Sequence, residues 1–253
     1  MKKIFLECAL LLFFLSLGSC ASTAQNESNT GALESYNHAM FKFNRAVEKG
    51  VLRPVAKGYK KVTNSYIRQR ISNFFSNIAE PVSMANHMLQ GEMHNSGQNL
   101  ARFVINTTIG GLGLYDVASK AGLEKKNTGF DETLAVWCVP DGPYIVLPIL
   151  GPSTPRATTG WAVDGYSSPS YWIAKDSHDD NADLIYYSSA GLKYLNNYAQ
   201  NLNFIEEMEN GSLDYYETLK STYMQNRTKL KACGIRQNET SPDYDFDMDM
   251  EED

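Results

Sequence analysis

The chain has few of the residues that build catalytic and metal centres. Its 253 residues include only four histidines and four cysteines. It lacks the nucleophile pattern G-x-S-x-G, the zinc-protease pattern H-E-x-x-H, a glycine-rich phosphate loop with lysine, and a C-x-x-C pair. No apolar run approaches the roughly 20 residues that a membrane-spanning helix needs. We therefore expect no enzyme activity, no cofactor beyond covalently attached lipid, and no transmembrane helix.

Charge of either sign is scarce in the body of the chain. The formal net charge of -6 comes from the end of the sequence, where Glu239 to Asp253 holds eight acids and no base. Without this stretch and the first 19 residues, the chain has 21 basic and 20 acidic residues. A nucleic-acid-binding protein shows a basic balance instead, so we expect no nucleic-acid partner. Residues 237–253 are expected to form a disordered acidic tail.

The first twenty residues have the order of a secretory leader. Lys2 and Lys3 precede the short apolar run Ala9–Leu17, and the small residues Gly18 and Ser19 stand directly before Cys20. This order resembles a bacterial lipobox, with residues 1–19 as signal peptide and an acylated Cys20 at the start of a flexible lipidated linker, 20–32. More than one acyl chain on Cys20 would give stable anchoring. The alternative is an ordinary leader with an incidental cysteine.

Export leaves two further cysteines in an oxidising compartment. Cys138 and Cys233 can form a disulfide there if their Cα atoms lie within about 7 Å, which the sequence does not show. Ala21, rather than an aspartate, follows Cys20, and in bacterial lipoproteins this implies sorting to the outer membrane. We expect a lipid-anchored protein on the periplasmic face of that membrane in a Gram-negative-type bacterium.

Hydrophobic periodicity predicts a mainly α-helical body with little or no sheet. In Leu33–Val51, Tyr36, Met40, Phe43 and Val47 form one stripe opposite a basic face. Such a helix packs on a core or lies in a membrane interface, and the sequence leaves both open. Further helices are predicted from Gln69 to Glu80, from Pro81 to Leu89, from Asp183 to Met208 and from Leu213 to Lys231. The proline-rich stretch Val139–Gly160 predicts a loop with at most one short strand.

The segment Phe103–Tyr115 carries no charge and contains Gly110, Gly111 and Gly113. It predicts a helix that ends in a glycine turn and continues as a second short apolar stretch, either buried or re-entering a membrane. Glycines also permit hinge motion. We expect alanine at the three glycines to alter lipid leakage more than folding.

The histidines and acids do not predict a site. His87 and His94 are seven residues apart, but Gly91 between them interrupts the helix that would align them. We therefore expect no metal site. The pair Asp131 and Glu132 is expected to have a structural role.

Several stretches together resemble the MlaA family (also called VacJ) of outer-membrane phospholipid-transport lipoproteins. The resemblance runs in one order from Leu33 to Gln225. The matching residues include Met40-Phe41-Lys42-Phe43-Asn44, Leu52-Arg53-Pro54-Val55-Ala56, Glu80-Pro81-Val82, Leu89-Gln90-Gly91, Gly110 to Gly113, Gly142-Pro143-Tyr144-Ile145-Val146-Leu147-Pro148, Asp214, Tyr216 and Tyr223. The domain that it marks spans residues 33–236.

The resemblance implies a flat ring of amphipathic helices in the inner leaflet of the outer membrane, around a central channel. Mislocalised outer-leaflet phospholipid would descend through this channel to maintain lipid asymmetry, without covalent chemistry. Gly110, Gly111 and Gly113 would form a hairpin or hinge beside the channel. Implied partners are phospholipid, a trimeric outer-membrane porin, and a soluble periplasmic lipid carrier that feeds an inner-membrane transporter.

Two other functions remain open from the sequence. One is a structural envelope lipoprotein that anchors partners and conducts no lipid. The other is a lipid-modifying hydrolase, because a catalytic triad is not visible from sequence order alone.

Overall fold

The computed structural model describes residues 27–176 and 181–228. The described residues are mainly α-helical, as the sequence predicted, and they contain one two-stranded sheet. The expected signal peptide, Cys20, Cys233 and the expected acidic tail lie outside the described residues. The elements are α2 Glu27–Val47, the π-helical turn η2 Glu48–Leu52, α3 Arg53–Val62, α4 Ser65–Leu89, α5 Met93–Thr108, α6 Val117–Lys120, α7 Phe130–Val136, β1 Ile145–Leu147, β2 Gly151–Ser153, α8 Pro155–Ser167, α9 Pro169–Asp176, α10 Ala182–Gln200, α11 Leu202–Gly211 and α12 Tyr215–Thr228.

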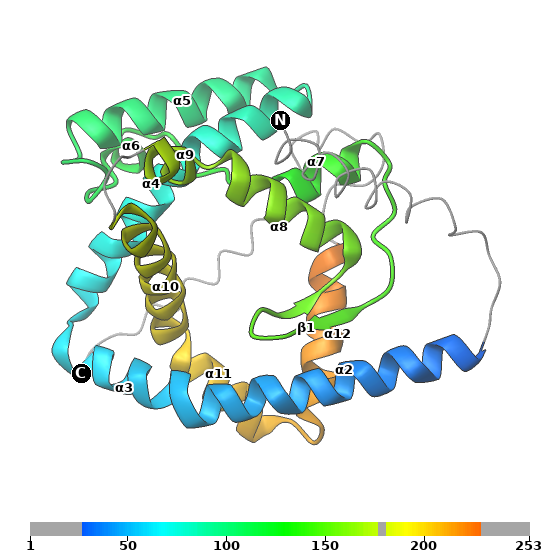
Figure 1. Ribbon diagram of the computed structural model, residues 1–253. Helices are drawn as coiled ribbons and strands as arrows, with labels where there is room; N and C mark the ends of the chain where they lie inside the picture. Colours follow the sequence, from blue (N-terminus) through cyan, green and yellow to red (C-terminus); the bar gives the residue numbers. More distant parts are fainter. Residues whose placement is uncertain (1–26, 177–180, 229–253) are drawn as a thin grey trace.

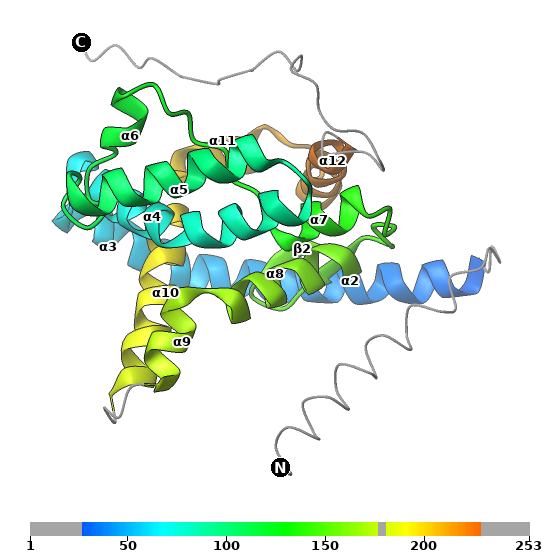
Figure 2. The ribbon, with the colours of Figure 1, turned by 90° about the horizontal axis from the view of Figure 1, so that it is seen from above.

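The helices follow one another around a closed outline (Figure 1). The long α2 runs along one side, and α3 and α4 lead to the opposite side, where α5 lies beside α4. α8 starts at the β1–β2 hairpin, near α2, and runs toward α9. Figure 2 shows α9 and α10 side by side, projecting from the rest of the body. No helix in the described part of the chain combines the length and the apolar character needed to cross a bilayer.

Three of the expected helix boundaries are wrong. The helix expected from Asp183 to Met208 is two helices, α10 and α11, which meet at Asn201. The first helix begins at Glu27, inside the range 20–32 expected as a flexible linker, because extending an existing helix adds one backbone bond per residue at little cost. Pro81 lies inside the continuous helix α4 and does not start a new one. Proline inside a helix costs about 3 kcal/mol, and the buried hydrogen bonds of Glu80 and Ser83 on either side offset this cost.

The stretch expected to be a loop holds more structure than predicted. β1 and β2 pair antiparallel, with Val146 opposite Pro152. α8 then begins at Pro155, which stands in the first turn where its missing N–H costs nothing. The side chain of Thr154 caps this helix by accepting a hydrogen bond from the Ala157 N–H at 3.2 Å.

Two asparagines of α2 hold the hairpin in place. Asn37 donates to the Tyr144 carbonyl at 3.1 Å and accepts from the Val146 N–H at 2.9 Å. Asn44, two turns later on the same face, donates to the Leu147 carbonyl at 2.8 Å and accepts from the Ile149 N–H at 2.6 Å. The two side chains satisfy the free edge of β1 much as a neighbouring strand would.

Candidate functional site

The interior of the protein is polar and much of its surface is apolar. Among the described residues, sixteen polar or charged residues are buried, compared with nine apolar ones, and five of those nine are alanine. Soluble proteins normally bury large apolar side chains and expose charged ones. Large exposed side chains include Ile109, which is 73% exposed, together with Val51, Val62, Met93, Leu112, Trp161, Ile173, Leu184, Ile185 and Tyr187. The distribution is that of a protein whose surroundings are partly apolar.

The helix pair α4–α5 shows most clearly that polar side chains are buried while apolar ones are exposed. Four polar residues of α5 recur at helical spacing and are all buried, namely Ser96, Asn99, Arg102 and Asn106. The apolar side chains of Leu100 and Val104 lie on the other side of the helix and are half exposed. α4 likewise buries Asn77, Glu80, Ser83, Asn86 and His87.

Arg102 is the centre of a polar seam between these helices, which we define as Arg102 with its partners Glu80, Asp116 and Ser119. Only 2% of Arg102 and 1% of Glu80 are exposed. The Arg102 Nε donates to Glu80 Oε1 at 2.8 Å, and Nη2 donates to Asp116 Oδ2 at 3.1 Å. Nη1 donates to Ser119 Oγ at 2.9 Å and to the Leu123 carbonyl at 2.5 Å. One guanidinium thus joins α5 to α4, α6 and the following loop.

Asp116 makes this seam sensitive to acid. Burial opposes ionisation of Asp116, but hydrogen bonds from Ser119, Arg102 and Asn106 outweigh it and lower its pKa from 3.8 to about 2. A carboxyl group with a depressed pKa contributes stability above its usual pKa and loses it as the pH falls through the folded value. This contribution, about 2 kcal/mol, should therefore disappear between about pH 4 and pH 2. Circular-dichroism melts across this range should show a smaller acid-induced loss for Asp116→Asn, and an unchanged loss would contradict the assignment.

A small polar cavity of about 20 Å³ lies beside the seam. This volume suits about one water molecule. Ser76 Oγ and Asn77 Oδ1 are buried without a hydrogen-bond partner among the described residues. The lining residues are Asn73, Ser76, Asn77, Glu80, Arg102, Asn106, Asp116 and Lys125.

Two lysines meet near this cavity. Lys125 lines it, and Lys193 of α10 is close enough that its pKa is lowered, first by desolvation and then by the charge of Lys125. The two positive charges attract anions to this part of the protein.

The predicted glycine segment is a tight turn after α5. Gly111, Leu112 and Gly113 have positive φ angles of 60°, 60° and 87°. The Gly113 N–H donates to the Asn106 carbonyl at 2.8 Å, and the Tyr115 N–H donates to the Gly110 carbonyl at 2.9 Å. The helix thus ends in a glycine turn, as the sequence predicted, and the turn folds back on the last residues of α5. A hinge role for these glycines stays a prediction.

An alanine Cβ would meet different surroundings at each of the three glycines, and whether the substitutions alter lipid leakage more than folding stays a prediction. A Cβ at Gly113 would lie 2.5 Å from the Asn77 Cβ, and one at Gly110 would meet the backbone of Tyr115 and Asn106. Nothing lies near Gly111, although its positive φ strains any larger residue. Gly110 and Gly113 are therefore required for packing.

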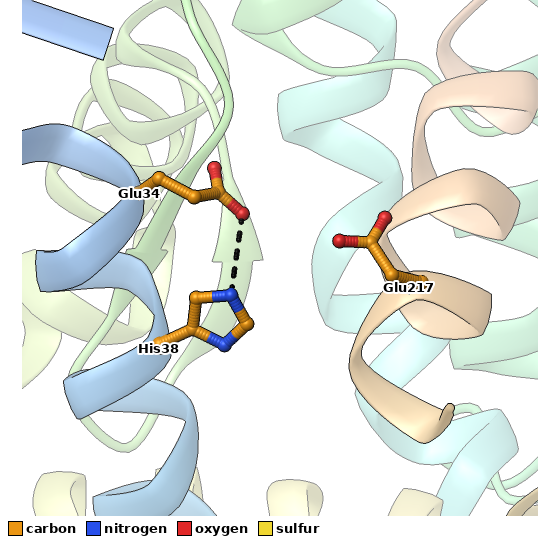
Figure 3. A group of neighbouring side chains, drawn as sticks. All are labelled: Glu34, His38 and Glu217. Carbon is orange, nitrogen blue, oxygen red and sulfur yellow. Dashed lines mark ion pairs between the residues drawn. The ribbon is translucent and has the colours of Figure 1, made fainter. Parts of the chain in front are cut away.

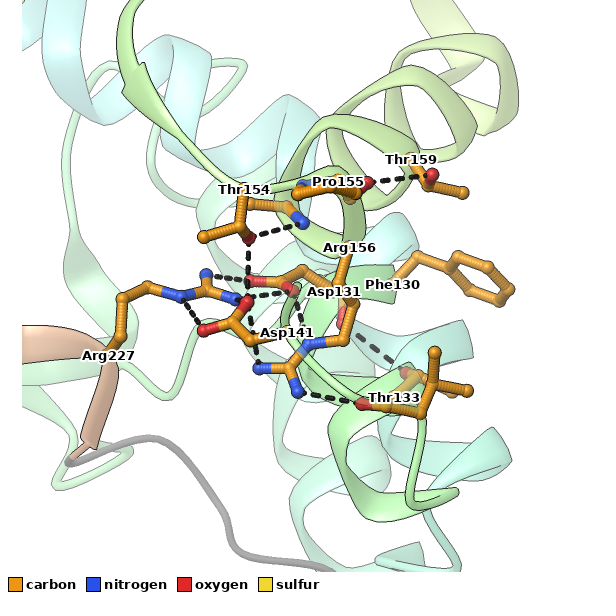
Figure 4. A network of polar contacts seen from close by, with 12 residues as sticks. Phe130, Asp131, Thr133, Asp141, Thr154, Pro155, Arg156, Thr159 and Arg227 are labelled. Carbon is orange, nitrogen blue, oxygen red and sulfur yellow. Dashed lines mark hydrogen bonds and ion pairs between the residues drawn. The ribbon is translucent and has the colours of Figure 1, made fainter. Parts of the chain in front are cut away.

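A second ionic cluster holds the last helix (Figure 4). Arg227 of α12 donates to Asp141 Oδ2 at 2.9 Å and to Asp131 Oδ1 at 3.0 Å. Arg156 of α8 donates to the same Asp131 oxygen at 2.9 Å, and Thr154 donates to Asp141 at 2.6 Å. Asp131 therefore has the structural role expected from the sequence.

Comparison with known proteins places the chain in a family. Residues 30–230 match the family described as MlaA lipoprotein. A protein of Haemophilus influenzae named "Intermembrane phospholipid transport system lipoprotein MlaA" is 35% identical, with 85% of this chain and 86% of that protein covered. The Escherichia coli protein of the same name is 31% identical over 68% of this chain and 70% of its own length. The chain belongs to the MlaA lipoprotein family.

Other similar proteins agree with this family. An uncharacterised protein of Rickettsia typhi is 42% identical over 134 residues, and the match spans about half of either chain. A solved structure described as "Structural basis for maintenance of bacterial outer membrane lipid asymmetry" is 30% identical, with a TM-score of 0.65 over 77% of this chain and 95% of that one. The family and the helical fold predicted from the sequence are confirmed.

The MlaA motif residues lie at structural positions. Asn44 binds the hairpin, Pro54 lies in the first turn of α3, and Pro81 lies inside α4. Gly142 has a φ of 81°, and a Cβ there would lie 3.0 Å from the Pro155 ring. Pro143 and the buried Tyr144 lead into β1, and Pro148 starts the hairpin turn, where its carbonyl accepts from the Leu150 N–H at 2.8 Å.

The remaining predicted sites stand as follows. Cys138 is disulfide-bonded, but Cys233 lies outside the described residues, so their pairing stays a prediction. His87 is buried and hydrogen-bonds to Glu92 at 2.9 Å, whereas His94 is exposed. Sequence reasoning missed the buried polar stripe of α5, whose three- and four-residue spacing was visible but was not expected to face inward.

Proposed function

We propose that the protein lies in the inner leaflet of the outer membrane, where it lets mislocalised outer-leaflet phospholipid pass toward the periplasm. The reversed distribution of polar and apolar side chains carries this proposal. Apolar side chains facing outward are stable against acyl chains, and buried polar groups satisfy one another where water is absent. Because no described helix can cross a bilayer, the body would occupy one leaflet.

The polar interior supplies a reason for lipid conduction. A phospholipid headgroup does not cross hydrocarbon readily, because an unpaired charge there is costly. Lys125, which lines the polar cavity, and Lys193, whose pKa is lowered in part by the charge of Lys125, would offer positive charge to the headgroup phosphate. The acyl chains can remain in apolar surroundings while the headgroup follows polar groups. This transfer needs no covalent chemistry.

The proposed channel would run within the closed outline that the helices follow in Figure 1. In this proposal Cys20 carries the lipid anchor on the periplasmic side. A trimeric porin would stabilise the ring in the membrane, and a soluble periplasmic carrier would accept the lipid. The names of the relatives, which refer to an intermembrane phospholipid transport system, support this assignment.

The test measures phospholipid in the outer leaflet of cells that lack the gene. Outer-leaflet phospholipid should rise on deletion and return to normal with the wild-type gene. The variant Lys193→Glu should restore it at most partly, because the new charge repels the headgroup phosphate. Lys61→Glu, a charge reversal at an exposed lysine of α3, serves as the matched control. Unchanged outer-leaflet phospholipid on deletion would contradict conduction and favour the envelope-anchoring alternative.

A further inference from the structure

Three potential metal ligands meet between the first and last helices (Figure 3). Glu34 and His38 are four residues apart on α2, and Glu217 comes from α12. Glu34 Oε1 lies 3.6 Å from His38 Nε2. One ligand atom from each of the three residues lies within 4.8 Å of the others. Residues 183 positions apart in the sequence thus form one cluster.

The donor set suits a zinc-class ion. Zinc binds imidazole nitrogen and carboxylate oxygen at about 2.0–2.2 Å, so tetrahedral donors lie about 3.3 Å apart. Glu34 and His38 are already near this separation. The three side chains are partly exposed, so rotation of their outer torsions can complete the approach without moving the backbone. Three protein ligands leave a fourth position for water.

The hydroxyl of Tyr144 is an independent observation at the same place. Tyr144 is only 8% exposed, and its hydroxyl has no hydrogen-bond partner within the described residues. Burial and then the charges of Glu34, Tyr223 and Glu217 raise the pKa of Tyr144 to about 12. The centroid of the Tyr144 ring lies 5.8 Å from Lys220 Nζ and 6.4 Å from the centroid of the Tyr216 ring, and both of these side chains contact Glu34. The tyrosine with the unpartnered hydroxyl therefore adjoins the cluster, and a metal-bound water there would offer it a partner.

The cluster already holds a cation of the protein itself. Lys220 Nζ lies 2.9 Å from Glu34 Oε1 and 4.0 Å from Glu217 Oε1. The Tyr216 hydroxyl donates to Glu34 at 2.7 Å, and its ring lies 4.1 Å from that of His38. The ammonium of Lys220 thus stands between the two acids. A divalent ion would compete with it and send this flexible side chain into solvent.

We propose that Glu34, His38 and Glu217 bind a zinc ion that joins α2 to α12 in exchange for the ammonium of Lys220. Binding would fasten the two helices that flank the β1–β2 hairpin. The proposal does not depend on lipid conduction.

Zinc titration of the full chain in detergent, after treatment with a chelator, tests the proposal by calorimetry. His38→Gln and Glu217→Gln should each weaken zinc binding by roughly tenfold or more. His94→Gln, which removes an exposed histidine elsewhere, should bind like the wild type. Lys220→Met should bind more tightly, because the competing charge is gone. All variants keep the acids of Glu239–Asp253, so any zinc that these acids bind is the same in every protein compared.

A melting experiment supplies the second readout. Zinc should raise the Tm of the wild type and of His94→Gln, because a ligand that binds only the folded state stabilises it. The Tm of His38→Gln should respond much less. Equal affinity and equal Tm response in the wild type and His38→Gln would overturn the proposal, as would no zinc response in either protein.

Discussion

Replacing Arg102 with methionine should lower the free energy of unfolding by about 3–5 kcal/mol. The guanidinium is almost fully buried and joins Glu80 to Asp116. Methionine fills similar volume but leaves the Glu80 carboxylate buried without a cation. Removing one member of a buried ion pair is expensive because the remaining charge is uncompensated. Chemical denaturation in detergent, followed by circular dichroism, measures the loss.

The double variant Arg102→Met with Glu80→Gln separates charge from packing. Glutamine keeps the shape of Glu80 and can still accept a hydrogen bond from Asn99. The double variant should be more stable than Arg102→Met alone, because the unpaired charge is gone. If the two single effects add without coupling, the ion pair is not what holds α4 to α5.

Two glutamates on the outer face of α5 should release the body from membranes without unfolding it. Leu100 and Val104 are half exposed and lie opposite the buried polar stripe. Moving a carboxylate into an apolar interface costs about 1–3 kcal/mol per residue, so the pair should weaken vesicle binding by at least about thirtyfold. The melting temperature should change little, because exposed positions contribute little to folding.

Vesicle flotation measures this effect best in a Cys20→Ser background, which removes the proposed site of acylation. His94→Glu adds one negative charge to α5 away from Leu100 and Val104 and should bind vesicles nearly as well as the parent. If His94→Glu and Leu100→Glu/Val104→Glu lost vesicle binding equally, the added charge and not the apolar face of α5 would control binding.

The periodic part of the fold was predictable from sequence. Tyrosine and leucine at helical spacing indicated α10 and α12, and their structure agrees. α8 was missed because Pro155 was interpreted as a loop residue, although Thr154 before it is the N-cap of the helix. Short helices such as α7 depend on tertiary bonds, which a local pattern does not contain.

The orientation of the helices was not predictable from the pattern alone. An amphipathic helix shows two faces, but the sequence does not say which face meets solvent, protein or lipid. The buried bonds of Asn99 and Arg102 decide this for α5. The Glu34–His38–Glu217 cluster was missed for a different reason, since its third ligand lies far along the chain. Only the packing of α12 near α2 brings it into reach.

Nitroxide accessibility in reconstituted bilayers tests the central claim, that the protein faces lipid with apolar residues and keeps polar groups inside. One label is placed at a time at Val104, Ile109, Trp161 or Lys193. The account predicts that the first three collide more with oxygen, which concentrates in lipid, and that Lys193 collides more with a water-soluble nickel chelate. Higher nickel accessibility at Val104, Ile109 and Trp161 would contradict it.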